Sequence, residues 1–337
     1  MYTTLMKISR YISVFGFAST VLFNTLLIIL TGWYLKIKLG AYKHLIIIFS
    51  IIGMVFDSLD FIFHPTLLSV NSGFIAFVNM ETKLLSKETL TVLISIYGAS
   101  FYISTSFLAV MFIHRYFSVV KPAQLYHFQR KRIILWVSYT VFNGSIFFFT
   151  CNFLCRIDEF SKNYFSEQVF QAFHEHIDEI PGVTVIVVDN FGIRWKNVVF
   201  LIICQLTLIF QNIIIIYCGR KIRRKLYSKD STYSTGLRNL HKQFFKTLVF
   251  QVVTPTILLF VPTLILFYLP FFGIQMNFPI GVTFCLFTLY PAIDSCIVMY
   301  VITEYRKALR EFLRDIYGRR KETNLDQRNE IRLKSMV

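Results

Sequence analysis

Three aspartates stand out because they interrupt segments that are otherwise apolar. Asp57 and Asp60 are three residues apart, so a helix would place both on one face, and Asp294 interrupts a segment near the C-terminal end. Charged side chains inside a membrane span are costly and are usually functional. Two roles stay open for Asp57 and Asp60: an interhelical hydrogen bond or ion pair, with His64 available to Asp60 one turn later, and the binding of a ligand or cation. A third role, proteolysis by a pair of aspartates, is disfavoured because the sequence lacks the local motifs of such proteases.

A cluster of polar and aromatic residues ends another apolar segment. His114, Arg115 and Tyr116 come shortly before Lys121-Pro122, which should end the helix. The arginine could extend along its helix to the membrane interface. The alternative is a switch residue that holds or releases a cytoplasmic partner.

A basic run after a later apolar segment also has two interpretations. It could anchor the chain to lipid headgroups, or it could be a docking surface for a partner. Its members are Arg220, Lys221, Arg223 and Arg224, followed by Lys225.

Prolines interrupt the last two apolar segments. Pro255 and Pro262 lie in the first, and Pro291 lies in the second, within the sequence Tyr290-Pro291-Ala292-Ile293-Asp294. Each proline removes one backbone hydrogen bond and bends its helix. We expect Pro255, Pro262, Tyr290, Pro291 and Asp294 to form a hinge, and the alternative is that the prolines only shape packing.

Motifs of enzymes and metal sites are missing from the sequence. It contains no HExxH, no GxSxG, no phosphate-binding loop and no dinucleotide-binding fingerprint. Its six cysteines show no CxxC or Cys/His metal spacing. We therefore predict no enzyme, no cofactor and no metal. The cysteines are interpreted as buried thiols, and an outer disulfide stays open for Cys151 or Cys155.

The elements that must position these residues are membrane-spanning helices. Hydrophobic residues make up 55% of the 337 residues and charged residues 16%, against about 25% in a typical soluble domain. A span needs about 20 apolar residues, and residues 247–293, which carry no charge, are long enough for two spans with a turn near Pro270 and Pro279. The predicted spans are 11–35, 44–64, 89–114, 133–155, 197–219, 247–269 and 279–302. The expected fold is an all-α membrane protein, a seven-transmembrane helix bundle, with a juxtamembrane helix 304–317 and a flexible basic tail 318–337.

The distribution of Lys and Arg predicts which end of the bundle is inside. Of the 35 Lys and Arg residues, 27 lie on the face that carries the C-terminal tail and 8 on the face that carries the N-terminus. The face with the excess is cytoplasmic, so the N-terminus is predicted to be outside. This placement favours the membrane over nucleic acid as the reason for the net charge of +16. The acidic outer segment 156–196 is expected to be a solvated loop, with a ligand lid as the alternative.

Several short motifs, in this order and spacing, resemble the Str type of nematode serpentine chemoreceptors, the group that includes the diacetyl odorant receptor. The resemblance extends from about residue 15 to residue 315. Its motifs are Leu39-Gly40-Ala41-Tyr42-Lys43 with Pro65, Phe101-Tyr102, Ser106-Phe107, Arg115-Tyr116-Phe117, Tyr217-Cys218-Gly219, Lys246-Thr247-Leu248-Val249 with Gln251, Pro255-Thr256, Pro262-Thr263, Pro270-Phe271-Phe272, and Tyr290-Pro291-Ala292-Ile293-Asp294 with Arg306. Ser295 stands where the family usually has a proline, which removes a second bend.

The resemblance implies a G-protein-coupled receptor (GPCR) in the plasma membrane, on the cilium of a chemosensory neuron. Such a receptor detects a small odorant or pheromone and activates a heterotrimeric G protein. Arg115 would occupy the switch position that faces the G protein, and the Tyr290–Asp294 segment would be the hinge of the last span.

We expect the ligand to bind in the outer half of the bundle. The predicted pocket residues are Asp57, Asp60, Tyr97, Ser100, Ser104, Phe267 and Tyr268. The alternative function is a ligand-gated cation channel of the seven-span olfactory type, whose N-terminus lies inside, against the charge distribution found here. A transporter would need paired broken helices or an internal repeat. A retinal-based light receptor would need a lysine in the last span, and residues 279–302 contain none.

Overall fold

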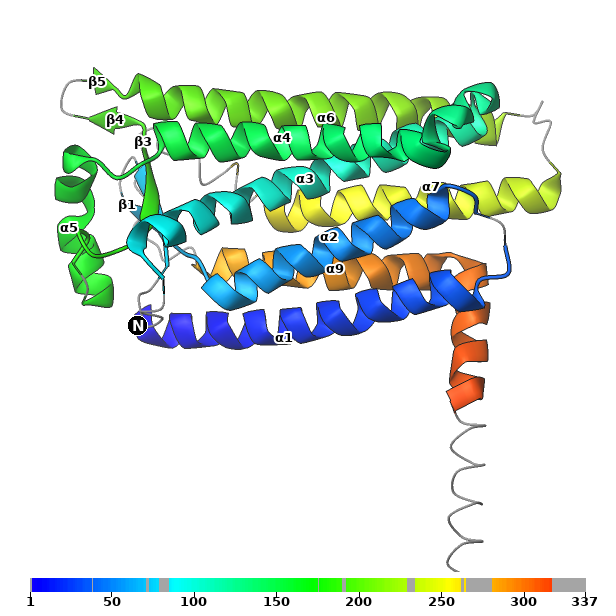
Figure 1. Ribbon diagram of the computed structural model, residues 1–337, viewed down its shortest axis with the longest axis horizontal. Helices are drawn as coiled ribbons and strands as arrows, with labels where there is room; N and C mark the ends of the chain where they lie inside the picture. Colours follow the sequence, from blue (N-terminus) through cyan, green and yellow to red (C-terminus); the bar gives the residue numbers. More distant parts are fainter. Residues whose placement is uncertain are drawn as a thin grey trace, which may run out of the picture.

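The structure is a computed structural model, and it describes residues 2–37, 39–70, 73–78, 85–174, 176–189, 192–228, 234–261, 264 and 281–316. For residues 2–6, 130, 172, 189, 259 and 281–286 it describes the backbone alone. The described segments form a bundle of long helices that run side by side (Figure 1). The helices are α1 (Tyr2–Ile29), which continues as the π-helical turn η1 (Leu30–Tyr34), α2 (Tyr42–Phe63), α3 (Lys87–Val119), α4 (Ile133–Leu154), α6 (Trp195–Tyr227), α7 (Thr235–Pro255), which continues as the π-helical turn η4 (Thr256–Phe260), and α9 (Gly281–Val301).

The helices are arranged around α3. This helix packs against α2, α4, α6 and α7, while α1 packs against α2 and α9. Among the described helices, α1, α2, α3, α4 and α6 are long and apolar enough to cross a membrane. Their outward surfaces carry large apolar side chains such as Phe153, which is 79% exposed, and Leu135, which is 70% exposed. A soluble protein rarely exposes continuous apolar surface of this kind, so the surface indicates a bundle embedded in a bilayer.

Several helices extend beyond the predicted spans: α1 begins at Tyr2, α7 begins at Thr235, and α3 and α6 continue at their C-terminal ends. α3 continues past residue 114 to Val119 and stops before Lys121-Pro122, as the proline requires. α6 continues past residue 219 to Tyr227, so the basic run is helical. Hydropathy locates only the uncharged part of such a helix, because the helical backbone continues past Arg115 or Arg220 without a change in geometry.

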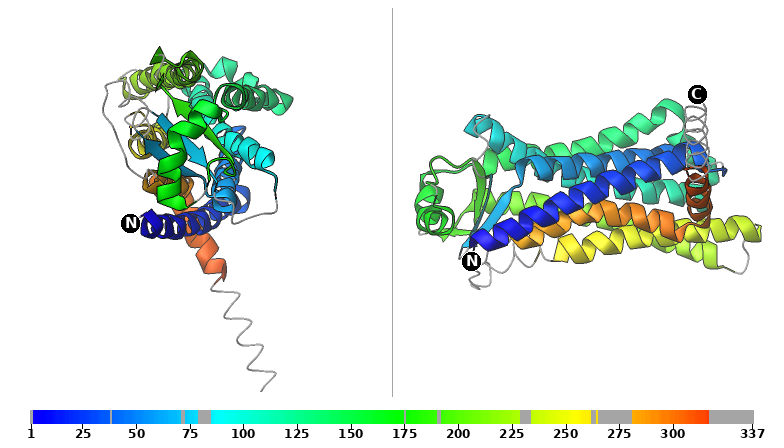
Figure 2. Two further views of the ribbon diagram at one scale, coloured as in Figure 1. Left: turned by 90° about the vertical axis from the view of Figure 1, so that its left-hand side faces the viewer. Right: turned by 90° about the horizontal axis from the view of Figure 1, so that it is seen from below.

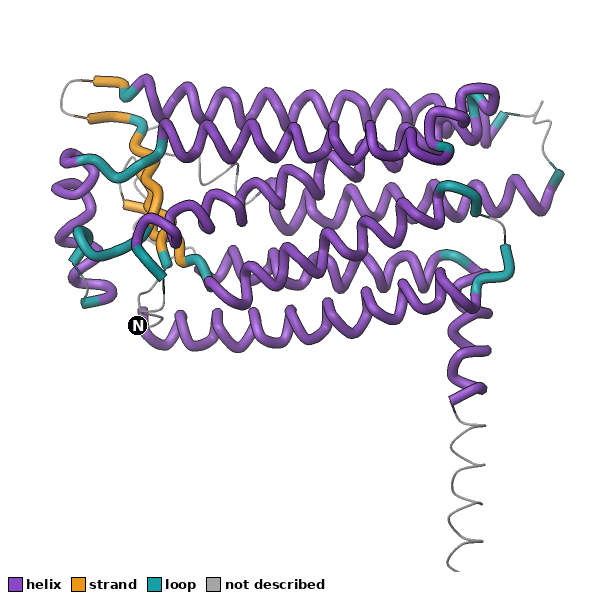
Figure 3. Tube along the Cα trace, in the orientation of Figure 1, coloured by secondary structure: helices purple, strands orange, loops and turns teal. Residues whose placement is uncertain are grey.

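The end of the bundle near the N-terminus carries a β-sheet that the all-helical prediction did not include (Figure 3). Strands β1 (Thr66–Val70), β2 (Gly73–Phe77) and β3 (Gly182–Ile186) are antiparallel and lie in this order, and β4 (Val188–Asp189) pairs with β5 (Gly192–Ile193). Helix α5 (Glu159–Phe173) packs on the sheet, and Phe77, Phe165 and Ile186 belong to the buried apolar cluster between them. We call β1, β2, β3 and α5 the cap. Much of the segment 156–196, expected to be a solvated loop, is thus folded.

The opposite end of the bundle carries the basic residues and short helical segments. Residues 303–316 are helical and turn across the axis of the bundle (Figure 2). The turn after α3 forms the 3₁₀ segments η2 (Pro122–Phe128) and η3 (Arg130–Arg132). The turn expected near Pro270 and Pro279 and the tail 318–337 lie outside the described residues. We refer to the two ends as outer and inner, following the Lys and Arg distribution.

The contact between α1 and α9 generates a test of the packing. An alanine Cβ at Gly16 would lie 2.9 Å from the backbone oxygen of Thr288, whereas one at Gly32 would meet no atom within 4 Å. We expect Gly16→Ala to separate the two helices at a cost of about 1–3 kcal/mol, and Gly32→Ala to be neutral or slightly stabilising. Thermal unfolding of both purified variants measures this, and equal melting temperatures would contradict the packing described.

Candidate functional site

A cavity of about 300 Å³ lies in the outer half of the bundle, directly below the cap. Its walls come from α2, α3, α4, α6, η4 and α9, and its roof comes from the three strands of the cap. Lining side chains include Phe56, Leu67, Phe74, Tyr97, Phe101, Tyr102, Phe147, Val183, Phe200, Cys204, Leu208, Phe260 and Phe287. The sheet therefore covers the cavity, and one of its three strands, β3, belongs to the outer segment 156–196, for which the sequence left a ligand lid open as the alternative.

Stacked aromatic rings form much of the cavity wall. Tyr102 and Phe147 stack with ring centres 4.8 Å apart, and Phe56 and Tyr97 stack at 5.0 Å. Phe101 contacts rings from other helices, with Phe287 of α9 at 6.1 Å. Such surfaces favour apolar or flat ligands, and a few polar groups such as the Tyr97 hydroxyl can orient them.

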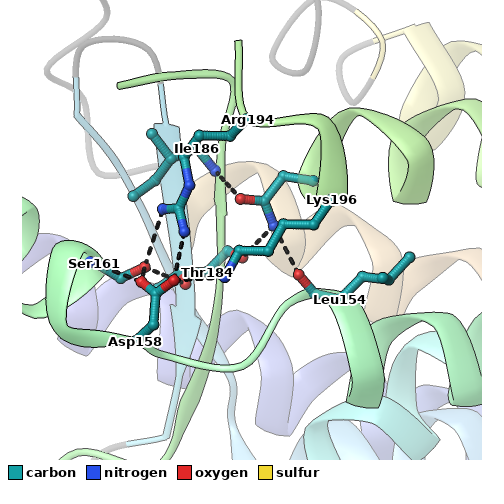
Figure 4. A network of polar contacts seen from close by, with 8 residues as sticks. Leu154, Asp158, Ser161, Thr184, Ile186, Arg194 and Lys196 are labelled. Carbon is teal, nitrogen blue, oxygen red and sulfur yellow. Dashed lines mark hydrogen bonds and ion pairs between the residues drawn. The ribbon is translucent and has the colours of Figure 1, made fainter. Parts of the chain in front are cut away.

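The cap is tied to the helices by a polar network around Asp158 (Figure 4). Asp158 caps the N-terminus of α5 by accepting a hydrogen bond from the backbone N–H of Ser161 at 2.9 Å. Its other oxygen, Oδ2, accepts from both Arg194 and Lys196, which lie at the start of α6. Asn197 donates to the backbone oxygen of Leu154 at 2.9 Å, which adds the end of α4. The network therefore joins α4, α5 and α6 beside the lid.

The charges of this network change the ionisation of Asp158. Burial by itself would raise the pKa of the Asp158 carboxyl. Hydrogen bonds from Lys196 and Ser161, and the charge of Arg194, outweigh burial and hold the pKa below its ordinary value. The carboxylate is thus charged at neutral pH and contributes to the stability of the cap.

The residues predicted to line the ligand pocket are found at different depths. Tyr97 lines the cavity. Ser100 donates its hydroxyl to the backbone oxygen of Tyr97 at 2.6 Å, and Ser104 donates to that of Ser100 at 3.0 Å. Ser104 borders a smaller void below the cavity, and Ser100 lines neither. Phe267 and Tyr268 lie outside the described residues.

Asp57 and Asp60 lie on the side of α2 that faces α1. Ser13 of α1 donates to Asp60 Oδ2 at 2.6 Å, so Asp60 forms the interhelical hydrogen bond that the sequence left open. Asp57 is fully buried beside Thr20. Neither aspartate is among the side chains that line the cavity.

Below the cavity, a polar network joins α1, α7 and α9. Asn24 donates to the backbone oxygen of Pro291 at 3.3 Å and accepts a hydrogen bond from Ser295 at 2.7 Å. Gln251 of α7 donates to Asp294 at 2.7 Å. Ser295, at the position where the resemblance led us to expect a proline, is thus a partner of Asn24. Asn24 was not among the predicted site residues, although a single amide in an apolar segment was a signal that could have identified it.

The predicted hinge residues lie next to these contacts. After Pro255 the helix widens into the π-helical turn η4, and both a proline and a π-helical turn are places at which a helix bends. Tyr290 is buried one residue before Pro291. Pro262 lies outside the described residues. The two interruptions fall in neighbouring helices, since α7 packs against α9.

Arg115 lies at the inner end of α3, between two aromatic rings. Its guanidinium carbon is 3.5 Å from the ring centre of Tyr42, at the start of α2, and 3.7 Å from that of Phe244, on α7. The residue is only 5% exposed, so it does not extend to the membrane interface. Its Nε and Nη2 atoms make no hydrogen bond to the described residues. We call Tyr42, Arg115 and Phe244 the arginine clamp, which holds α2, α3 and α7 together.

The neighbours of the clamp divide into buried and exposed groups. His114 stacks on Tyr42 at 5.3 Å, and Tyr116 is buried against Tyr217 of α6. On α6, Ile222 and Leu226 pack into the core. The exposed side of the same helix carries Arg220, Lys221, Arg223 and Arg224. The inner end therefore combines a buried cation with an accessible basic surface.

The fold and its inner and outer sites have the organisation of a serpentine receptor, a bundle of membrane helices with a lidded cavity at one end. Comparison with known proteins specifies the family. Residues 9–310 match the family described as "Serpentine type 7TM GPCR chemoreceptor Str". The chain belongs to this family, and both the family resemblance and the helical seven-transmembrane fold expected from the sequence are confirmed.

Individual relatives agree with this assignment. The Caenorhabditis elegans "G-protein coupled receptor str-33" is 30% identical over 318 residues, which cover 92% of each chain. The Caenorhabditis briggsae "Serpentine receptor class r-10" is 27% identical, over 93% of this chain and 91% of the relative. The C. elegans "G-protein coupled receptor str-217" is 26% identical, over 86% of this chain and 85% of the relative.

The Asp158 network generates a prediction about pH. A carboxyl whose pKa is lower in the folded than in the unfolded state stabilises the fold above its unfolded pKa of about 3.9, and this contribution is lost as the pH falls toward the folded-state pKa. We expect Asp158→Asn, which preserves a capping side chain, to lower the melting temperature at pH 7. The difference from wild type should shrink below about pH 4.

The control is Glu159→Gln, because Glu159 is exposed and pairs with Lys162 away from the network. Melting temperatures measured across this pH range should be nearly equal for wild type and this control. A destabilisation by Asp158→Asn that does not change with pH would show that the charge of Asp158 is unimportant.

Proposed function

We propose that this chain is a chemosensory GPCR that binds a small, mostly apolar odorant or pheromone in the cavity below the cap and activates a heterotrimeric G protein at its inner end. The observation that carries the proposal is the connected series of contacts between these two places. Phe101 of the cavity stacks on Phe287 of α9, Asp294 of the same helix bonds to Gln251 of α7, and α7 supplies Phe244 to the arginine clamp. A ligand that moves α9 or α7 can therefore alter the clamp.

The ligand acts by its difference in affinity between two arrangements of the bundle. Binding that favours an outward position of the inner half of α7 withdraws Phe244 from Arg115. Bending at Pro255 and η4 allows this movement. Phe260 of η4 also lines the cavity, so a ligand there acts directly on the bending segment. The freed Arg115 and the basic surface of α6 then line a cleft for the C-terminal helix of a G-protein α-subunit.

The proposed location follows from the charge distribution and the family. The basic inner end faces the cytosol and the cap faces the exterior of the plasma membrane. A cap on the outside agrees with its role as the lid of a site for external molecules. The cilium of a chemosensory neuron is the site expected for a member of this family.

The cavity can be tested by filling it. Leu208 on α6 lines the cavity, whereas Leu206 on the same helix points away from the bundle and is 59% exposed. We expect Leu208→Trp to raise the EC50 of an agonist more than about tenfold, because the larger side chain occupies the ligand's space. Leu206→Trp should leave the EC50 unchanged.

The agonist comes from a panel of volatile and pheromone-like compounds screened on cells that express the full chain, with calcium as the readout. Surface labelling confirms that both variants reach the membrane. An unchanged response in Leu208→Trp would place the ligand elsewhere.

The arginine clamp can be tested from both sides. We expect Arg115→Ala to abolish activation of the G protein with surface expression intact, because the cleft loses its central cation. We expect Phe244→Ala to raise ligand-independent activity severalfold, since a weakened clamp favours the open arrangement. Phe245→Ala, one residue further along α7, is the matched control. Nucleotide exchange on the G protein measures all three, and normal signalling by Arg115→Ala would refute the role of Arg115.

A further inference from the structure

A groove of about 890 Å³ lies on the outside of the bundle, along α9 and between α1 and α7. It is separate from the ligand cavity and opens toward the surrounding bilayer. Its trough includes Phe250 of α7, which is 40% exposed, and Ile293 of α9, which is 36% exposed. Lys246 of α7 and Arg306, which follows α9, also line it.

The groove has the length of one membrane leaflet. Among the described residues, its lining on α9 extends from Leu289 to Val301. At a rise of about 1.5 Å per residue this is roughly 18 Å, a little over half of the ~30 Å hydrocarbon thickness. Apolar side chains dominate along α9, and the polar groups gather at the inner mouth. The length and polarity of the groove therefore match one acyl chain of a lipid in the cytoplasmic leaflet, with the lipid headgroup at the inner mouth.

Two cations, Lys246 and Arg306, stand at the inner mouth of the groove. Arg306 donates to the Thr303 hydroxyl at 3.1 Å, and the Lys246 amine lies 5.6 Å from the ring centre of Phe250. Neither forms an ion pair with a carboxylate of the described residues. By contrast, the neighbouring Lys307 pairs with Glu304 at 2.8 Å. The two charges at headgroup depth are complementary to a phosphate.

We propose that one anionic phospholipid of the cytoplasmic leaflet occupies this groove. Its phosphate lies between Lys246 and Arg306, and one acyl chain lies along Phe250 and Ile293. A lipid whose headgroup carries a net negative charge is preferred, because a zwitterionic headgroup brings a further cation to a mouth that already holds two. This binding is independent of the proposed G-protein coupling.

The position of the groove gives the lipid a regulatory consequence, which rests on the proposed function. The groove is bounded by α7 and α9, and Gln243 of α7 accepts a hydrogen bond from the backbone N–H of Thr303 at 2.9 Å. A lipid that contacts both helices stabilises their present arrangement. Movement of the inner half of α7 then requires the lipid to shift with it.

The binding is tested by native mass spectrometry of the detergent-solubilised full chain, incubated with equal amounts of dioleoyl phosphatidylserine and dioleoyl phosphatidylcholine. We expect the phosphatidylserine adduct to exceed the phosphatidylcholine adduct at least fivefold. The double variant Lys246→Gln/Arg306→Gln should lose this preference. The control Lys242→Gln/Lys307→Gln removes the same charge from adjacent positions outside the groove and should retain it.

Two further measurements distinguish a lipid seated in the groove from an anion held by surface charge alone. Ile293→Trp fills the trough without changing the charge, and it should reduce phosphatidylserine retention severalfold. Glycerophosphoserine, the headgroup without acyl chains, should not compete with the lipid. Equal retention by the Lys246/Arg306 double variant, or full competition by the soluble headgroup, would overturn the proposal. Melting temperatures near that of wild type show that each variant is folded.

Discussion

The arrangement of this protein depends on one constraint, that a polar side chain in the middle of a bilayer must find its partner within the protein because no water is available. The constraint explains why Asn24, Gln251 and Asp294 all face the interior. Asn24 of α1 bonds to α9, and Gln251 of α7 bonds to Asp294 of α9. These contacts hold α1, α7 and α9 at the same depth at which Pro291 interrupts the α9 backbone. The backbone of α9 therefore loses a hydrogen bond at the same level at which its side chains bond to α1 and α7.

The arginine clamp satisfies the same constraint in a different way. Burying a cation is costly, and a carboxylate partner would need to be desolvated as well. Two aromatic faces instead offer about 0.5–2 kcal/mol each without adding a second charge. Such a contact is strong enough to favour one arrangement of the bundle and weak enough to be broken by the binding energy of a ligand. An ion pair buried at this position would form a more permanent connection between α3 and α7.

The sequence was sufficient for the class of fold, a bundle of membrane helices, because long apolar segments have one stable structure in a bilayer. It identified Arg115 from its place at a helix end, but not Tyr42 or Phe244, since two aromatic residues among the many in this chain carry no signal of their own. The cap was missed for a related reason. Its strands Thr66–Val70 and Gly73–Phe77 are short and apolar, so hydropathy does not separate them from the end of a span. β2 pairs with β3, which is distant in the sequence, and local sequence patterns do not predict such long-range pairing.

The two ends of the molecule differ in how firmly their helices are held. At the outer end, the Asp158 network and the sheet tie α4, α5 and α6 into one unit, and this unit forms the roof of the cavity. At the inner end, α7 is held by the arginine clamp and by a hydrogen bond to Thr303, next to an open groove, and its hydrogen bond to Asp294 of α9 lies nearer the middle of the bundle. In the proposed mechanism, a ligand pressing on the cavity wall meets this tied unit, and the movement that it causes is directed toward α7 and α9. The backbones of these two helices are interrupted by Pro255 and Pro291, and their inner halves border the bilayer groove.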